Sequence, residues 1–349
     1  MKESKIIIPD CKKFTGYKPC IPGKNCLEEC DKKENIGQKI LIINLDAMGD
    51  VLMTTAQLKS LKKKYPNSTI YWLTRKNAAP LLYYNEYIDK ILTWDFESIL
   101  LLQQINFDVV LNADKSTQSC SLTNSLSSRS KYGFCLNDSG AIIPINESAN
   151  YNYIMGLNDE LKFRKNSKTG QEILAETFEL DYNRDEYILN LTQEEINFCN
   201  EYKKKNHILE NDLVVGFNTG CSDLYPNKKM TIEQHVYIIE KLSIYDKIKI
   251  ILLGGPEDTE RNNKISEFVG DKAILTPTTD GLRKGICYEN IADVVITGDT
   301  FGMHLAIGLK KYVIAWFGLS CWVEIDLYDR GVKLYQENLS CSPCWKKEC

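Results

Sequence analysis

The chain of 349 residues has no long hydrophobic run and only three histidines. Its amino-terminal apolar run, residues 6–8, is much shorter than the roughly 7–15 residues of a signal-peptide core. No stretch approaches the ~18 apolar residues of a membrane-spanning helix. We therefore expect a cytoplasmic protein without a transmembrane segment. The histidines, His207, His235 and His304, are far apart in the sequence and form no zinc-binding pattern.

The sequence also lacks an excess of charge of either sign. Lys and Arg together number 43 against 47 for Asp and Glu, and a net charge of −4 gives no sign of a nucleic-acid-binding protein. Hydrophobic residues make up 43% and charged residues 26%, which excludes a disordered chain. The length is typical of two domains or of one large domain.

Three common nucleotide-binding and metal-binding motifs are missing. The absence of G-x-G-x-x-G disfavours an oxidoreductase with a dinucleotide cofactor, and the absence of G-x-x-x-x-G-K-[ST] disfavours a P-loop nucleotidase. No Asp-x-Asp occurs, which removes the simplest carboxylate pair for holding a metal–diphosphate complex.

Cysteine, in contrast, is abundant, with 13 residues. In a reducing compartment these are expected to be thiols or metal ligands rather than disulfides. Six are scattered and are expected to be ordinary structural thiols, and the others form two terminal clusters: Cys11, Cys20, Cys26 and Cys30 at the start, and Cys341, Cys344 and Cys349 at the end. Thiolate sets of this kind suit structural iron or zinc. We predict a metal at the first cluster, with the second as the alternative, against a surface extension of reduced thiols.

The rest of the chain alternates between strand and helix patterns. A buried strand over residues 39–45 precedes a helix predicted over 51–64, and the pattern restarts with a strand at 213–217 and a helix at 231–243. This alternation predicts an α/β fold with two Rossmann-like domains facing each other across a cleft. We expect a cysteine-rich extension over 1–38 and domains over 39–190 and 191–349.

Ligands of such sheets bind beyond the carboxyl ends of the strands, so the loops there hold the candidate site residues. After the strand that ends near residue 296 come Asp299, Thr300, Gly302, Met303 and His304. Backbone N–H groups at this helix start would form a phosphate site. Asp299 and Thr300 could equally cap the helix.

A second loop follows the strand at 213–217 and contains Thr219 and Gly220, with Lys228 and Lys229 downstream. A lysine there can neutralise a diphosphate, although a solvated lysine pair is the simpler interpretation. In a third loop, Glu257 or Glu260 could bind a ribose hydroxyl or only complement a helix dipole.

The first loop places Asp46 and Asp50 on either side of Gly49. Asp50 stands where the next helix begins, so it could cap that helix. The functional alternative is a general base that faces the cleft.

Taken together, these loops resemble glycosyltransferase family 9, the heptosyltransferases that use ADP-heptose. Residues 298–306 resemble the family's Asp-Thr-Gly-x-x-His-Leu-Ala signature, with Phe301 and Gly302 where Gly and a variable residue are usual. Further matching stretches lie at residues 40–52, 61–66, 70–74, 254–257 and 317–318.

The resemblance implies a GT-B fold, with the acceptor in the amino-terminal domain and the nucleotide sugar in the other. It further implies an inverting transfer that needs no metal or cofactor. Asp50 matches the family's proposed base, and Lys228 matches the lysine of its Lys-x-Trp-Pro element, in which Met230 here replaces the tryptophan. The diphosphate would be stabilised by Thr219, Lys228 or Lys229, and the N–H groups at 302–304, while Glu257 or Glu260 would bind the ribose.

The partners implied are ADP-heptose or a similar donor and, as acceptor, a hydroxyl of a lipopolysaccharide core sugar or of a protein. Peripheral contact with a membrane and an oligomeric assembly both agree with this resemblance, since some autotransporter heptosyltransferases carry cysteine-bound iron and form large rings. Two other hypotheses stay open at this point. One is a non-catalytic binding or assembly protein on a GT-B scaffold with a cysteine-bound metal, and the other is an unrelated metal-dependent or redox enzyme.

Overall fold

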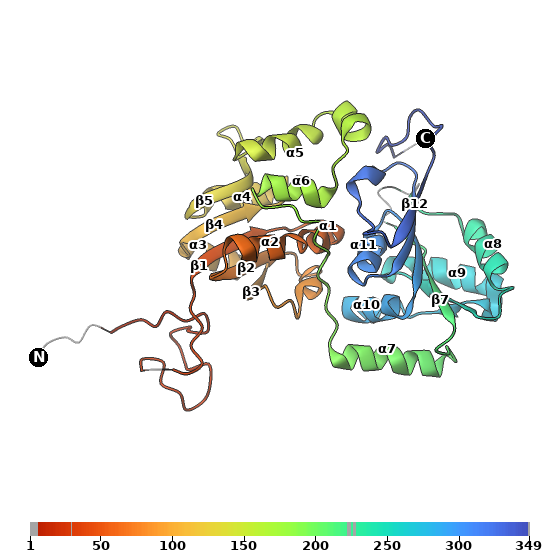
Figure 1. The fold of residues 1–349 in the computed structure, drawn as a ribbon, viewed down its shortest axis with the longest axis horizontal. Coiled ribbons are helices and arrows are strands. Elements are labelled where there is room, and N and C mark those ends of the chain that lie inside the picture. Colours follow the sequence, from red (N-terminus) through yellow and green to blue (C-terminus); the bar gives the residue numbers. More distant parts are fainter. Residues whose placement is uncertain (1–5, 29, 222–224, 226–227, 348–349) are drawn as a thin grey trace, which may run out of the picture.

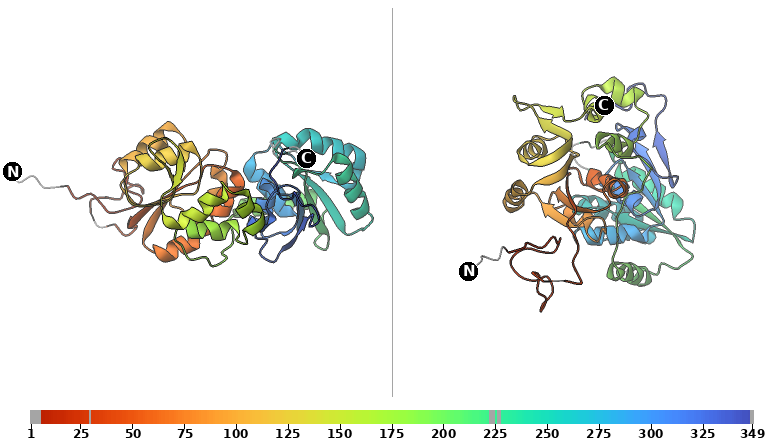
Figure 2. Two further views of the ribbon diagram at one scale, coloured as in Figure 1. Left: turned by 90° about the horizontal axis from the view of Figure 1, so that it is seen from above. Right: turned by 60° about the vertical axis from the view of Figure 1, so that its left-hand side comes forward.

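The computed structural model describes residues 6–28, 30–221, 225 and 228–347. Within these residues the chain folds into two lobes, each built around a parallel β-sheet covered by helices (Figures 1 and 2). The predicted fold class, two Rossmann-like α/β domains, agrees with this architecture. None of the described helices is long and apolar enough to cross a membrane.

The first sheet, within the described residues, has six strands in the order β3-β2-β1-β4-β5-β6. All neighbouring pairs are parallel except β5 and β6. The strands are β1 (Gln38–Ile43), β2 (Ser68–Thr74), β3 (Lys90–Thr93), β4 (Phe107–Asn112), β5 (Ser128–Leu136) and β6 (Ile142–Pro144). The interior strands are continuous apolar runs because helices cover both faces of the sheet.

The helices of this lobe are α1 (Met48–Thr54), α2 (Gln57–Lys64), α3 (Phe96–Gln104), α4 (Thr117–Ser125), α5 (Asn150–Met155) and α6 (Gly170–Thr177). Short helical turns lie at η1 (Ala79–Leu82), η2 (Glu147–Ala149) and η3 (Leu161–Lys165). The prediction of a single helix over 51–64 was wrong, because this stretch belongs to two helices, α1 and α2. The chain breaks it at Thr55, whose hydroxyl donates to the Leu52 carbonyl at 2.6 Å and accepts from the Ile188 N–H at 2.8 Å.

The second sheet, again within the described part, has six parallel strands in the order β12-β11-β10-β7-β8-β9. They are β7 (Leu213–Asn218), β8 (Ile248–Leu253), β9 (Ile274–Leu275), β10 (Val294–Gly298), β11 (Tyr312–Phe317) and β12 (Gly331–Tyr335). Around them lie α7 (Gln193–Lys205), α8 (Ile232–Leu242), α9 (Thr259–Val269), α10 (Leu282–Ile291) and α11 (Phe301–Gly308), with η5 (Pro256–Asp258), η6 (Gly270–Lys272) and η7 (Trp322–Glu324).

The strand order decides where each lobe can bind a ligand. In the first sheet the direction of winding reverses between β1 and β4, and in the second between β7 and β10. The loops after these strands diverge at the reversal and leave a crevice at the carboxyl ends. The loop from β1 to α1 and the loop from β10 to α11 therefore meet between the lobes, where α1 packs on α11 (Figure 1).

The cysteine-rich amino-terminal segment, residues 6–37, contains no helix or strand in its described residues and lies outside the first lobe (Figures 1 and 2). It is attached to the lobe by an ion pair from Lys12 Nζ to Asp89 Oδ1 at 2.8 Å. Thr69 Oγ1 also donates to the Ile36 carbonyl at 2.6 Å.

The carboxyl-terminal segment folds back onto the body between the lobes. The guanidinium of Arg164, from the first lobe, donates to the carbonyl of Ser342 at 2.8 Å and to that of Ser340 at 2.9 Å. The Cys344 and Trp345 N–H groups both donate to the Leu319 carbonyl at 3.0 Å. These contacts place Trp345 beside a cavity between the lobes.

Candidate active site

A cavity of about 920 Å³ lies between the lobes and is lined by residues of both. Eight of the residues singled out from the sequence line it: Asp50, Gly220, Lys228, Glu257, Asp299, Thr300, Gly302 and His304. Asp50 comes from the first lobe and is 170 residues from Gly220, the nearest of the others in the sequence. The tertiary structure thus brings together the loops that follow β1, β7, β8 and β10.

Asp50 enters the cavity from the first turn of α1. Its Oδ2 accepts a hydrogen bond from the Ala47 N–H at 3.1 Å, so it does cap the helix, as the simpler interpretation predicted. Asp50 is exposed to the cavity between the lobes, while protein groups of both lobes surround its carboxyl group. Burial raises the pKa of Asp50 above its ordinary value, while His304 and the Ala47 N–H act to lower it. A carboxylate of raised pKa facing a cavity can accept a proton from a bound hydroxyl group.

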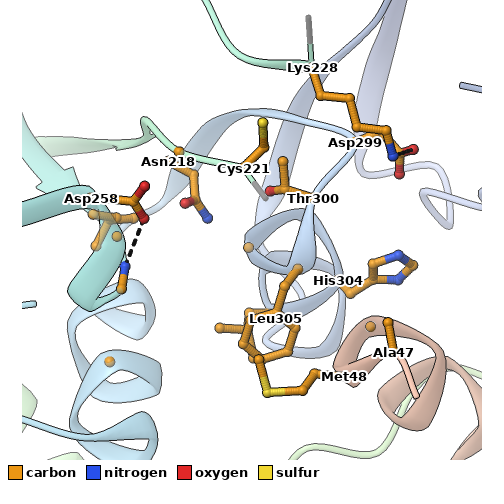
Figure 3. A pocket seen from close by; sticks show the side chains of 18 of the residues that line it. Ala47, Met48, Asn218, Cys221, Lys228, Asp258, Asp299, Thr300, His304 and Leu305 are labelled. Carbon is orange, nitrogen blue, oxygen red and sulfur yellow. Dashed lines mark hydrogen bonds and ion pairs between the residues drawn. The ribbon is translucent and has the colours of Figure 1, made fainter. Parts of the chain in front are cut away.

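His304 projects from α11 toward α1, across the boundary between the lobes (Figure 3). Its Nδ1 lies 3.3 Å from the hydroxyl of Tyr187, and the two rings are stacked. Burial lowers the pKa of His304, although Asp50 and Asp299 favour its charged form. Burial is the larger effect, so it favours the neutral ring. Contacts with Tyr187 and with Gly49 fix the position of the ring.

Lys228 and Asp299 form an ion pair at the edge of the cavity, with Nζ 2.8 Å from Oδ2 (Figure 3). Burial alone would raise the pKa of Asp299, but the Lys228 ammonium outweighs it and holds this pKa below its ordinary value. The same ammonium lies 4.2 Å from the centre of the Trp345 ring. These contacts fix the position of the Lys228 ammonium beside the β10–α11 loop.

The amino-terminal end of α11 faces the same space. Thr300 is the N-cap, but its side chain accepts no capping hydrogen bond, and the hydrogen bonds to its carbonyl begin with the Met303 N–H. The N–H groups of Phe301 and Gly302 precede that first bond, as helix-start donors that an anion can use. A Cβ on Gly302 would overlap the side-chain amide of Asn218, so a larger residue here would displace that amide.

The two glutamates proposed for the ribose differ in position. Glu257 lines the cavity, whereas Glu260 points to solvent and pairs with Lys264 at 2.6 Å. Between them, Asp258 also lines the cavity, and its Oδ2 accepts from the Gly255 N–H at 2.9 Å (Figure 3). Burial raises the pKa of Asp258. Of the two alternatives, the geometry favours Glu257.

Three more predicted residues do not line the cavity. Thr219 is buried behind the loop and donates its hydroxyl to Asn262 Oδ1. Met303 is completely buried in the core. Lys229 interacts electrostatically with Asp258 and acts to lower the pKa of that carboxyl. Their roles in binding stay predictions, and any contribution from Thr219 or Met303 is through the shape of the loops.

A smaller cavity of about 470 Å³ adjoins the first in the amino-terminal lobe and shares Asp50, Lys162 and Glu324 with it. Its walls include Asp114, whose pKa burial raises to about 7, and Lys115, whose pKa burial lowers to about 8. Asp50 therefore stands where the large cavity between the lobes meets a smaller cavity that is lined mainly by the first lobe.

Several lining residues escaped the sequence analysis. Asn218 and Asp258 adjoin residues that it did single out, so their places at strand ends were a usable signal. No local sequence pattern pointed to Lys162, Glu324 or Trp345. These residues reach the cavity only through the packing of η3, η7 and the carboxyl-terminal segment. Two of the scattered cysteines, Cys221 and Cys321, also line it.

The predicted metal site gains no structural support. Among the described residues, no group of three or more His, Cys, Asp or Glu side chains is placed to hold a metal ion. Cys11, Cys20, Cys26 and Cys30 lie along a segment of turns and bends, and Cys349 lies outside the described residues. The metal stays a prediction.

Comparison with known proteins gives a consistent result. Residues 100–349 match the family model of glycosyltransferase family 9 (heptosyltransferase). The chain is 24% identical over 306 residues to lipopolysaccharide heptosyltransferase 1 of Campylobacter coli, covering 80% of this chain and 84% of that protein.

Solved structures share the fold. A family 9 glycosyltransferase from Veillonella parvula superimposes with a TM-score of 0.70, at 18% identity and 87% coverage of both chains. The ADP-heptose lipopolysaccharide heptosyltransferase II of E. coli gives a TM-score of 0.61, at 15% identity, covering 85% of this chain and 90% of that chain. The two lobes thus have the GT-B arrangement of these enzymes, as predicted.

Proposed function

Because the chain belongs to glycosyltransferase family 9, the heptosyltransferases, we propose that it transfers heptose from ADP-heptose to an acceptor hydroxyl group with inversion and without a metal. The observation that carries this proposal is the position of Asp50. It faces the large cavity at the point where the smaller cavity of the first lobe opens into it.

The donor would bind on the second lobe. Its diphosphate would lie against the N–H groups of Phe301 and Gly302, with Lys228 as the counter-charge, and Glu257 would bind ribose hydroxyls. As the bond to the sugar breaks, the diphosphate gains negative charge. N–H groups and an ammonium that are already fixed in place stabilise that charge without reorganisation of the protein.

Asp50 would act from the opposite side. With the leaving diphosphate on the second lobe, an acceptor hydroxyl held in the first lobe lies on the other face of the sugar, which is the geometry of inversion. Asp50 would take the hydroxyl proton as the oxygen attacks the anomeric carbon. The raised pKa of this carboxyl makes it a stronger base than an ordinary aspartate.

The acceptor would occupy the smaller cavity. Its lining combines apolar side chains with charges of both signs, including Asp46, Asp114, Lys115 and Lys162. Such a lining suits the hydroxyl groups of a sugar, so we propose a glycan acceptor such as a lipopolysaccharide core sugar, with a protein hydroxyl as the alternative.

The chain is a glycosyltransferase by its family, which argues against the hypotheses of an assembly protein and of an unrelated redox enzyme.

The donor is tested by thermal unfolding with ADP-heptose, ADP-glucose, UDP-glucose and GDP-mannose. A ligand at about 100 times its dissociation constant stabilises a fold by about 2.7 kcal/mol. ADP-heptose is expected to give the largest shift. Equal or larger shifts with UDP-glucose or GDP-mannose would contradict the proposal.

Metal independence is tested separately. Transfer in the presence of excess EDTA is expected to match transfer in untreated protein, because Lys228 and the helix amides supply the counter-charge. A loss of transfer that Mg²⁺ specifically restores would show that a metal activates the diphosphate.

A further inference from the structure

Beyond Glu257, the large cavity continues as a slot between the loop after β9 and the first turns of α10. The slot is lined by residues without charge: Thr276, Pro277, Thr278, Gly281, Leu282 and Gly285. A Cβ built on Gly281 or Gly285 would meet nothing within 4 Å, so open space lies directly over both. A slot of this kind suits a flat, uncharged ring.

Most polar side chains along the slot are already hydrogen bonded within the protein. Thr276 Oγ1 donates to the Leu252 carbonyl at 2.6 Å, and the hydroxyls of Thr278 and Thr259 are 2.6 Å apart. The hydroxyl of Tyr288 donates to Asp280 at 2.6 Å. These hydroxyl groups have no proton left to donate to a ligand and can only accept a hydrogen bond from one.

Glu289 differs from these side chains. It lines the cavity, is only 3% exposed, and its Oε1 has no hydrogen-bond partner among the described residues. Four residues separate it from Gly285 on α10, so both lie on the same face of that helix. A buried polar atom without a partner costs free energy in the unliganded protein. Such a cost is common where a ligand supplies the missing partner.

The charge state of Glu289 also suits a neutral ligand. Burial raises the pKa of Glu289 well above its ordinary value, and Lys311 is the charged group that opposes this shift. A raised pKa favours the neutral carboxylic acid, which carries one hydrogen-bond donor next to one acceptor. An adenine base offers the complementary pair, an amino group next to a ring nitrogen.

We propose that Glu289 binds the nucleobase of the donor, donating to a ring nitrogen and accepting from the adjacent amino group at the end of the slot. This inference rests on the nucleotide-sugar donor proposed above and adds the residue that recognises its base. Leu282, Pro277 and the open faces over Gly281 and Gly285 would enclose the ring.

The test compares three ligands with the full-length protein: ADP, UDP and inorganic diphosphate. Glu289→Leu removes both hydrogen-bonding atoms, whereas Glu289→Gln keeps one donor and one acceptor. We expect Glu289→Leu to weaken ADP binding about 10- to 100-fold and to leave diphosphate binding unchanged. Glu289→Gln is expected to bind ADP within about 3-fold of wild type.

Unfolding without ligand separates this role from a structural one. Leucine replaces an unpartnered acid, so Glu289→Leu is expected to be at least as stable as wild type. Ile291→Val, a small truncation at a buried position of α10 outside the cavity lining, serves as the control and is expected to keep full ADP affinity.

The outcomes distinguish the two proposals. If wild type binds neither ADP nor UDP, the proposed function fails. If wild type binds ADP and Glu289→Leu binds it equally well, or loses ADP and diphosphate to the same extent, the inference about Glu289 is wrong while the donor proposal stands.

Discussion

The ring of His304, on α11, lies so close to Gly49, on α1, that a Cβ on this glycine would be 2.5 Å from Cδ2 of the ring. This contact joins the second lobe to the turn that carries Asp50. The distance between the proposed base and the proposed diphosphate site therefore depends on the absence of one methyl group.

Gly49→Ala is expected to reduce transfer strongly, because the methyl group must displace His304 or push the two lobes apart. Overpacking of this kind costs about 1–3 kcal/mol of folding stability. Gly255→Ala is a matched control for stability, since its Cβ would meet nothing within 4 Å. Thermal unfolding and steady-state transfer measure both effects. A Gly49→Ala protein with wild-type turnover would show that this contact does not set the position of Asp50.

Asp50→Asn is expected to lower kcat by about 10²–10⁴-fold, the usual contribution of a general base. The amide keeps the size of the side chain but cannot take a proton. The dissociation constant of ADP is expected to stay near the wild-type value, because ADP would bind on the other lobe. If the variant turns over at the wild-type rate, Asp50 is not the base.

The pH dependence of transfer follows from the same residue. Asp50 must be ionised to accept a proton, so kcat/KM is expected to fall as the pH decreases through the pKa of this carboxyl. Burial raises that pKa, so the fall is expected to begin above the range near pH 4 that is typical of an exposed aspartate. A profile measured between pH 4 and 9 tests this sign. Activity that stays constant down to pH 4 would contradict the raised pKa.

Lys228→Ala is expected to weaken ADP binding about 10- to 100-fold, the loss of a charge-assisted contact, and to weaken adenosine binding much less. The same change leaves Asp299 buried without its partner. Lys229→Ala serves for comparison, because Lys229 does not line the cavity, and a smaller effect is expected. Titration calorimetry with both ligands measures the difference. A larger effect from Lys229→Ala would reverse the assignment.

Glu257→Gln is expected to weaken ADP binding about 10-fold, and Glu260→Gln to leave it near wild type. Glu257 lines the cavity, while Glu260 makes an exposed pair with Lys264, and such pairs contribute little. Binding of 2′-deoxy-ADP or 3′-deoxy-ADP to both variants tests whether the contact is to the ribose. Equal losses in the two variants would mean that neither carboxylate binds it directly.

Local sequence patterns were enough to predict the fold. The apolar runs at 39–45 and 213–217 predicted parallel strands, and β1 (Gln38–Ile43) and β7 (Leu213–Asn218) begin and end within two residues of those bounds. The break between α1 and α2 was not predictable in this way, because it depends on a hydrogen bond from Ile188, a residue distant in the sequence.

Part of the site was also readable from the sequence. Asp50, Lys228, Asp299 and Gly302 were singled out because chemistry-bearing residues at strand ends meet at one edge of a parallel sheet, and all four line the cavity. The choice between Glu257 and Glu260 stayed open, since both lie on one short stretch of chain and only the direction of the side chain separates them.

The sequence by itself determined the α/β class, the positions of the strand-end loops and the identity of the charged residues on them, because these depend on neighbours within a few residues. The tertiary structure decided which of those residues face a common space. It brought His304 against Gly49 and Trp345 against Lys228, and it left Glu289 buried in the cavity wall without a partner for Oε1 among the described residues. Contacts between residues this far apart depend on how the two lobes pack, and no local pattern records that packing.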